Sequence, residues 1–243
     1  MDPRAMEPHG AALWAYFEGD TAAELIVRRD DGQEGRLPAS RSFREPGDFT
    51  PIESTALARC AGHVLDVGAG SGLHSLALQQ RGLRVTAIDV EARSVELMAE
   101  RGVTDARCAD LFDCDAGPFD TLLMLGHGLG MVETLAGLDR FLAHVRGLLT
   151  RDGQVLLDSH DVRRTDDAAN LAYHAANRRA GRYIGEIRMQ LEHRGAAGPW
   201  CGWLHVDPGT LAEHAVRGGW TCEVLVGEAS GDYLARLTAE RRA

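Results

Sequence analysis

The sequence predicts an α/β protein with a doubly wound, mostly parallel sheet of seven strands. Between residues 63 and 159, short apolar runs alternate with amphipathic stretches, the pattern of a parallel sheet that helices cover on both faces. Two more apolar runs near the C-terminus, separated by Gly231-Asp232, predict an antiparallel hairpin at the edge of the sheet. Together these runs account for the seven strands.

Five apolar runs are predicted to be the buried strands of the central region: HVLDV at 63–67, RVTAID at 84–89, DARCAD at 105–110, DTLLMLG at 120–126 and QVLLDS at 154–159. The stretches between them repeat apolar residues every three or four positions, which is typical of helices. These helices are predicted at 73–80, 92–101 and 133–149. Gly82 and Gly102 follow the first two, where glycine can take a left-handed cap.

The flanking segments predict smaller elements. We divide the chain into an N-terminal lid segment at 1–61, a core at 62–160, a substrate-cap insertion at 161–206 and a C-terminal completion of the core at 207–243. The lid segment predicts a helix at 11–16, a hairpin around Asp31-Gly32 and a proline-containing stretch at 41–51. The insertion predicts a helix at 166–179 and a hairpin of strands at 182–194 and 200–206. The last segment predicts a helix at 208–217 and strands at 220–226 and 233–237.

Composition excludes several classes of protein. The chain has 243 residues and a net charge of -10, which argues against a broad nucleic-acid or anionic-membrane surface. Its five cysteines are odd in number and include no C-x-x-C pair, so neither a disulfide framework nor a zinc site is predicted. The N-terminus lacks the features of a signal peptide, and no apolar run approaches the ~20 residues of a membrane span. We therefore expect a cytoplasmic protein with reduced thiols.

The most informative segment is the glycine-rich loop from Asp66 to Gly72, between the first predicted strand and helix. Glycines let a backbone approach a nucleotide-type ligand closely, and helix N-terminal amides favour a negative group. Its glycine spacing is G-x-G-x-G, not the G-x-G-x-x-G of dinucleotide sites. Asp66, two positions before the first glycine, would repel a pyrophosphate and attract an ammonium group. Both features argue against a nicotinamide oxidoreductase.

This segment, VLDVGAGSG, resembles motif I of the class I S-adenosylmethionine-dependent methyltransferases, a Rossmann-like family. The resemblance implies S-adenosyl-L-methionine as cofactor and a small-molecule type of enzyme. It implies that Asp89 and the adjacent Val90 lie at the ribose, that Asp110 and Leu111 lie at the adenine, and that the loop after the fourth strand lies beside the transferable methyl. The implied cofactor-binding residues are Asp66, Gly68, Ala69, Gly70, Gly72, Asp89, Val90, Asp110, Leu111, Leu125 and Gly126. Taken singly, Asp66 could instead cap or ion-pair, and Asp89 could be a solvated strand end.

The loop after the fourth strand, Leu125 to Gly130, carries the candidate catalytic residue, His127. It lacks the N-P-P-Y or D-P-P-Y pattern of enzymes that methylate amide or base amino nitrogens. It resembles the L-G-N loop of small-molecule N-methyltransferases, with His127 in the asparagine position. We interpret His127 as a substrate-orienting group or general base, because an imidazole titrates near neutral pH. The alternative is a histidine that bonds a backbone carbonyl.

Four further residues are candidate substrate contacts: Tyr16, His160, Arg182 and Tyr183. His160 ends the fifth strand, where we predict hydrogen bonding and no metal site. The net-basic insertion could recognise a carboxylate through residues such as Arg182, although a solvated face is the alternative. The insertion itself could instead extend the sheet or form a homodimer interface.

We therefore expect a methyltransferase that acts on N or O of a small-molecule or small peptide-like acceptor, without nucleic-acid or membrane partners. The alternatives are a protein-directed methyltransferase and a catalytically silent cofactor-binding subunit.

Overall fold

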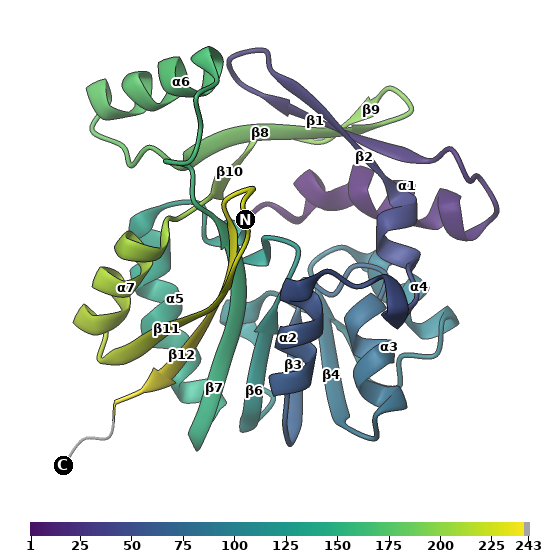
Figure 1. Ribbon diagram of the computed structural model, residues 1–243. Coiled ribbons are helices and arrows are strands. Elements are labelled where there is room, and N and C mark those ends of the chain that lie inside the picture. The colour runs from purple at the N-terminus through teal and green to yellow at the C-terminus, as the bar shows by residue number, and fades with distance from the viewer. Residues whose placement is uncertain (241–243) are drawn as a thin grey trace.

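The computed structural model describes residues 1–240 and contains a larger and a smaller sheet (Figure 1). The larger sheet has seven strands in the order β11-β12-β7-β6-β3-β4-β5. Their bounds are β3 His63–Val67, β4 Arg84–Asp89, β5 Ala106–Cys108, β6 Phe119–Met124, β7 Leu149–His160, β11 Trp220–Gly227 and β12 Asp232–Ala239. Strands β3 to β7 pair in parallel, while β12 and β11 add an antiparallel edge. The predicted fold class is confirmed.

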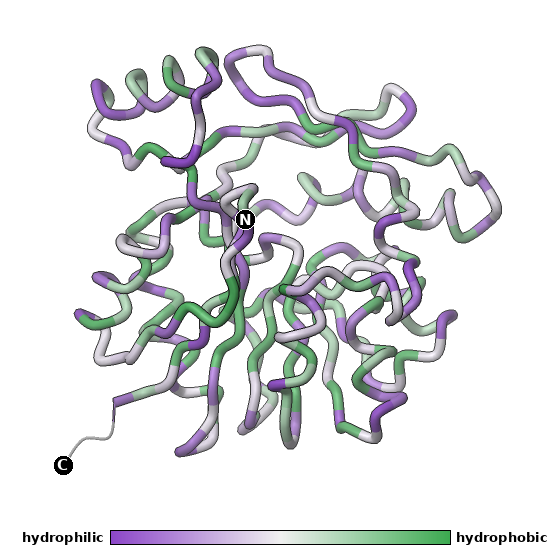
Figure 2. Tube along the Cα trace, viewed as in Figure 1, coloured by the Kyte–Doolittle hydropathy of each residue, from purple (hydrophilic) through white to green (hydrophobic). Residues whose placement is uncertain are grey.

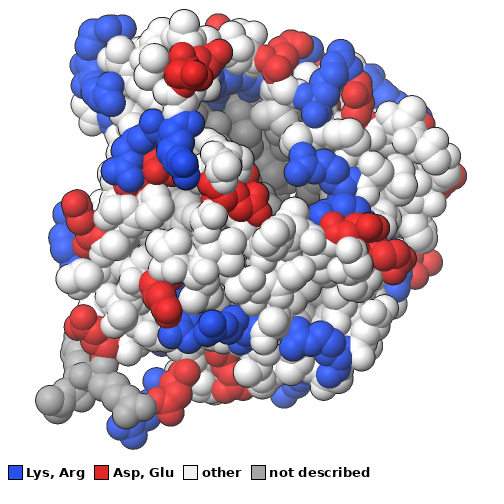
Figure 3. Space-filling model, viewed as in Figure 1, with Lys and Arg blue, Asp and Glu red and all other residues white. Residues whose placement is uncertain are grey.

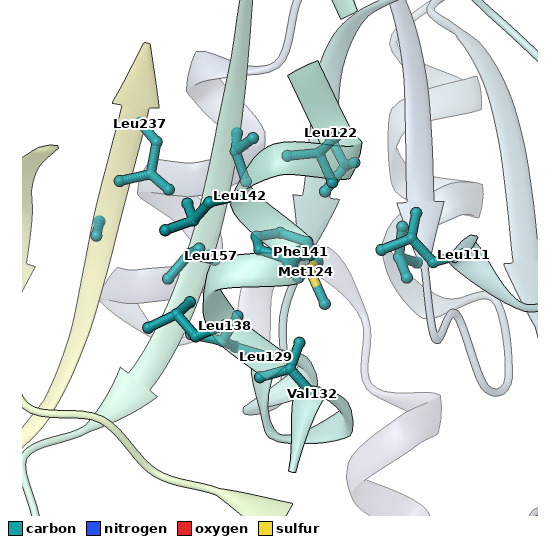
Figure 4. Packing of buried hydrophobic residues seen from close by; sticks show 14 of the residues in the cluster. Leu111, Leu122, Met124, Leu129, Val132, Leu138, Phe141, Leu142, Leu157 and Leu237 are labelled. Atoms are coloured by element: carbon teal, nitrogen blue, oxygen red, sulfur yellow. The ribbon is translucent and has the colours of Figure 1, made fainter. Parts of the chain in front are cut away.

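Helices cover both faces of this sheet. Successive side chains of a strand point to opposite faces, and both faces are apolar here, so each face must be buried against helices. One face packs against α2 (Pro51–Arg59) and α3 (Leu73–Gln80), with α4 (Ala92–Glu100) beside them. The other packs against α5 (Leu135–Leu148) and α7 (Pro208–Arg217). Figure 4 shows the α5 side chains Leu138, Phe141 and Leu142 against the β6 and β7 residues Leu122, Met124 and Leu157. Adjacent Leu122 and Leu123 belong to opposite clusters, so β6 is buried on both sides.

The N-terminal hairpin and the inserted hairpin form one structure, which we call the second sheet. It joins β1 (Glu24–Arg29) and β2 (Glu34–Pro38) to β8 (Glu186–His193), β9 (Ala196–Ala197) and β10 (Cys201–Leu204). Strand β1 pairs antiparallel with β8, with Val27 opposite Leu191. Helices α1 (Glu7–Phe17) and α6 (Ala168–Arg179) flank it, and α1 lies between the two sheets (Figure 1). Segments far apart in the sequence therefore lie together beyond the carboxyl ends of the parallel strands (Figure 1).

Several elements differ in extent from the predicted ones. Strand β7 begins at Leu149 and includes residues 149–153, ahead of the predicted start at 154, because Leu149 already pairs with Phe119 of β6. Strand β5 is only three residues long. Helix α1 begins at Glu7 and follows a 3-10 turn at Pro3–Met6 that the Asp2 side chain caps.

Helix α2 was not predicted, although its start is visible in the sequence. Thr50 and Glu53 form a capping box: the Thr50 hydroxyl accepts from the Glu53 amide at 3.2 Å, and the Glu53 carboxylate accepts from the Thr50 amide at 2.8 Å. Pro51 occupies the first helical turn, where its missing N–H costs nothing.

Hydrophobic residues concentrate in the strands and inner helix faces of the larger sheet (Figure 2). Within residues 1–240, none of the helices is both long enough and apolar enough to span a membrane.

We expect Glu53→Gln to lower the free energy of unfolding by about 2 kcal/mol at neutral pH, because the largely buried carboxylate accepts charge-assisted hydrogen bonds from Arg44 and His74. Burial raises the pKa of Glu53, but hydrogen bonds from His74, Arg44 and the Thr50 amide outweigh it and lower that pKa well below its usual range. The stabilisation is thus complete above the unfolded pKa of about 4.3 and is lost as the pH falls further.

Urea unfolding at several pH values measures this, with exposed Glu96→Gln on α4 as control. A difference between wild type and Glu53→Gln that stays constant down to pH 3 would contradict the assignment.

Candidate active site

The glycine-rich loop lies at the carboxyl end of β3 and leads into α3. Gly68, Gly70 and Gly72 all have positive φ, at 69°, 55° and 77°. A Cβ on Gly72 would lie 2.7 Å from the Val103 side chain, so this position also requires glycine for space. Asp66 is buried beneath the loop, where its Oδ2 accepts a hydrogen bond from the Ser75 hydroxyl at 2.6 Å. Burial raises the pKa of this carboxyl group.

The predicted acids on the next two strands lie close to this loop but have backbone partners. Asp89, at the end of β4, accepts from the Gly70 amide at 2.9 Å through Oδ2 and from the Glu91 amide at 2.9 Å through Oδ1. Asp110, after β5, accepts from the Phe112 amide at 2.9 Å. Asp89 therefore ties the loop to the end of the second strand of the core.

The residues that follow these acids differ in exposure. Val90 is half-buried after β4, and its carbonyl accepts from the Cys108 thiol at 3.7 Å. The Leu111 side chain belongs to the buried core, and its carbonyl oxygen lies 2.9 Å from His144 Nε2 of α5.

A cavity of about 390 Å³ opens above the loop, and Figure 3 shows a hollow with charged side chains at its rim. Six predicted residues line it: Gly68, Ala69, Gly70, Leu125, Gly126 and His127. Its carboxylates, from Glu53, Asp158, Glu228 and Asp232, outnumber its two guanidinium groups, from Arg41 and Arg44. This excess of negative charge suits a cationic ligand.

His127 lies where β6 ends, held at both its backbone and its ring. Its φ of 61° is in the left-handed region, and its amide donates to Asp158 Oδ1 at 2.8 Å. The ring Nε2 lies 3.3 Å from Asp232 Oδ1. Burial lowers the pKa of His127, but the hydrogen bond to Asp232 and the negative charges of Asp158 and Asp232 outweigh it, so the pKa is raised overall.

Two more histidines lie beside this ring. His160 Nδ1 is 2.8 Å from the same Asp232 oxygen. The ring of His205 is 5.3 Å from that of His127 and 6.0 Å from that of His160. Burial lowers the pKa of His205 to about 3, with a further contribution from its two histidine neighbours. Among residues 1–240, no group of three or more His, Cys, Asp or Glu side chains could hold a metal ion.

The other candidate substrate residues lie away from the cavity wall. The Tyr16 ring packs against the Phe43 ring, with the ring centroids 4.7 Å apart. Tyr183 donates from its hydroxyl to Asp207 at 2.7 Å. Arg182 is exposed, and neither it nor any other arginine of residues 161–206 is part of the described cavity lining.

The sequence reasoning missed several lining residues. His9 and Leu13 of α1 lie over Gly70, each 3.6 Å from the place of a Cβ there. Asp232 and Glu228 reach the cavity from the turn between β11 and β12. The apolar residues of α1 follow no helical period that singles out Leu13, and nothing local indicated that the C-terminal turn meets the β6 loop.

Comparison with known proteins agrees with this geometry. Residues 64–153 match a methyltransferase domain family. A SAM-dependent methyltransferase from Bacteroides fragilis, solved with S-adenosyl-L-homocysteine, is 36% identical, with a TM-score of 0.85 over 98% of this chain and 96% of that chain. The chain belongs to the S-adenosylmethionine-dependent methyltransferases. This methyltransferase is therefore an enzyme of the class I type that uses S-adenosyl-L-methionine.

More distant structures share the fold of the methyltransferase. The sugar N-methyltransferase KedS8 from Streptoalloteichus sp. is 14% identical, with a TM-score of 0.55 over 84% of this chain and 94% of that chain. The amino pentose methyltransferase CalS10 from Micromonospora echinaspora, solved with bound SAM, is 15% identical, with a TM-score of 0.54 over 82% and 94%. No curated protein sequence matches the methyltransferase significantly.

Proposed function

We propose that the methyltransferase transfers the methyl group to N or O of a small-molecule acceptor, with His127 as the residue that orients or deprotonates it. The observation that carries this proposal is the cavity of about 390 Å³, whose wall contains both the glycine-rich loop and His127. Its volume is in the range of roughly 300 to 1,000 Å³ that is typical of small-molecule sites. The cavity lining also includes Leu25 and Leu37 of the second sheet, so part of its wall lies above the larger sheet, which favours a small acceptor over a large protein substrate.

The residues present fit the cofactor. The loop from Gly68 to Gly70 exposes backbone to the cavity, and the acidic lining suits a cation. We propose that Asp66, Gly68, Ala69, Gly70 and Gly72 hold the methionyl side, that Asp89 and Val90 hold the ribose, and that Asp110 and Leu111 hold the adenine. Leu125 and Gly126 would then border the reacting end. When bound, the cofactor supplies an electrophilic methyl group on a sulfonium.

The protein residues then have three tasks. The cavity walls hold the acceptor in line and limit access of water, which accounts for much of the rate in such displacements. His127 accepts the proton that the acceptor N–H or O–H loses as the new bond to carbon forms. Asp158, Glu228 and Asp232 attract a basic acceptor, so we favour an amine. The sugar and amino pentose substrates named for KedS8 and CalS10 are consistent with a polar acceptor of this size.

His160, Tyr16, Arg182 and Tyr183 remain proposed substrate contacts, although none of them is part of the described cavity lining. The division of the chain into four parts, at residues 61, 160 and 206, also remains a proposal. So does a homodimer that forms through the inserted hairpin, and light scattering would test that homodimer.

Calorimetry and an acceptor screen test the proposed function. We expect S-adenosylmethionine and S-adenosylhomocysteine to bind and a nicotinamide dinucleotide not to bind. With methyl-labelled cofactor, label should enter amines of low molecular mass in metabolite extracts. Label that enters only protein would favour a protein-directed enzyme, and cofactor binding without any transfer would favour the silent subunit.

A further inference from the structure

We propose that Asp232 is a positioning residue that holds the His127 ring with Nε2–H toward the C-terminal hairpin and Nδ1 free for the acceptor. Asp232 is the first residue of β12, more than one hundred residues after His127 in the sequence. The inference rests on the proposed role of His127, which it deepens by naming the group that sets the tautomer and basicity of that ring.

The Asp232 carboxylate is itself firmly held. Its Oδ2 accepts from the Ser230 hydroxyl at 3.0 Å, within the turn that joins β11 to β12. Its Oδ1 is shared by two imidazoles, His160 Nδ1 at 2.8 Å and His127 Nε2 at 3.3 Å. The shorter contact anchors Asp232 to the end of β7, and the longer one leaves the His127 ring able to tighten when an acceptor binds.

The backbone of His127 is fixed by a different carboxylate. The left-handed backbone conformation of His127, with a φ of 61°, costs energy that surrounding contacts must offset. Asp158 makes one of these contacts, because its Oδ1 accepts a hydrogen bond from the His127 amide at 2.8 Å. Asp158 thus sets where the residue lies, and Asp232 sets which way its ring turns. Such a division of tasks is typical of a base that a third group orients.

The charges around His127 favour the protonated ring. Asp232 from β12 and Asp158 from β7 favour a positive charge on the ring, although burial raises the pKa of Asp158, and Arg41 from the 3-10 turn at Ala39–Phe43 opposes them. His160 from β7 and His205 after β10 complete the surroundings. His205 stays neutral near pH 7, since its pKa is lowered to about 3, so it does not repel a protonated His127.

The 3.3 Å separation of His127 Nε2 and Asp232 Oδ1 favours a proton on Nε2. An imidazole that donates from Nε2 to a carboxylate has its lone pair on Nδ1. His127 and Asp232 both line the cavity, so a proton taken up at Nδ1 would create an imidazolium already paired with Asp232. The Asp232 carboxylate would thereby compensate the charge that forms during methyl transfer.

NMR of ¹⁵N-histidine-labelled protein, saturated with S-adenosylhomocysteine, tests this without an identified acceptor. We expect neutral His127 to be the Nε2–H tautomer with a midpoint above that of a free histidine. Asp232→Asn keeps an acceptor oxygen but loses the charge, so the midpoint should fall by about one pH unit, a tenfold change in proton affinity. Asp232→Ala should also give a mixture of tautomers.

Asp139→Asn is the matched control, because Asp139 holds His214 Nδ1 at 2.6 Å between α5 and α7, outside the cavity lining. It should leave the His127 signals unchanged, and thermal unfolding checks that each variant is folded. An unchanged His127 midpoint in folded Asp232→Asn, or an unchanged tautomer in folded Asp232→Ala, would overturn the inference. Full turnover by His127→Ala would instead overturn the proposed role of His127, so the two failures are distinguishable.

Discussion

Gly70→Val is expected to weaken cofactor binding by this methyltransferase by ~100-fold or more, a loss of about 3 kcal/mol. Gly70 has a φ of 55°, and its Cβ position lies 3.6 Å from both His9 and Leu13 of α1. A branched side chain would fill the space between the loop and α1 and shift the amide that donates to Asp89. Calorimetry with S-adenosylhomocysteine measures the loss.

Gly82→Val is the control for backbone strain alone. Gly82 has a φ of 81°, after the end of α3, and no atom lies within 4 Å of its Cβ position. It should lower the unfolding temperature but leave the dissociation constant unchanged. Equal losses of affinity in both variants would show that strain, and not contact with the ligand, explains the effect at Gly70.

His127→Ala should lower kcat for the transferred methyl group by about 100-fold, near the lower end of what a general base contributes. The dissociation constant of the cofactor should hardly change. The lost ring contacts Asp232, and the backbone at Gly126, which we propose borders the cofactor, is not altered by the substitution. A raised pKa means that the wild-type rate should increase with pH up to a midpoint above about 6.5, as the ring loses its proton. The variant should lack this dependence.

The measurement is the rate of S-adenosylhomocysteine release with the acceptor that the screen yields. His174→Ala is the control, since His174 lies on α6, outside the described cavity lining. If His127→Ala turned over at the wild-type rate, positioning by the cavity walls would be the whole mechanism and His127 would have no catalytic role.

The sequence was most informative where structure is local. Strands β3, β4, β6 and β7 bury both faces, so their apolar runs are continuous, and the loop from Asp66 to Gly72 needs its glycines in place. Each of these features involves residues that are close together in the chain, so the larger sheet and the cofactor loop could be predicted from the sequence.

Long-range pairing could not be predicted in the same way. Strand β2 is exposed throughout, and β1 has a single buried residue, so neither shows a period that reveals its partner β8. The meeting of Asp232 with His127 depends on β12 lying antiparallel to β7, which sets Asp232 opposite His160. Helix α2 was missed for a different reason, since its Thr50-Glu53 capping box was legible but the prolines nearby favoured a loop.

The second sheet has a consequence for how the enzyme is made. Arg28 and Glu192, which pair within it, are 164 residues apart. During synthesis the parallel core can assemble first from neighbouring βα units, whereas β1 must wait for β8 to leave the ribosome. The second sheet is therefore completed after the parallel strands β3 to β7 have emerged, and of the strands only the edge hairpin of β11 and β12 follows it. To transfer the acceptor preference of one relative to another, we would accordingly exchange residues 24–38 and residues 186–204 in the same chimera, because β1 and β8 pair with each other.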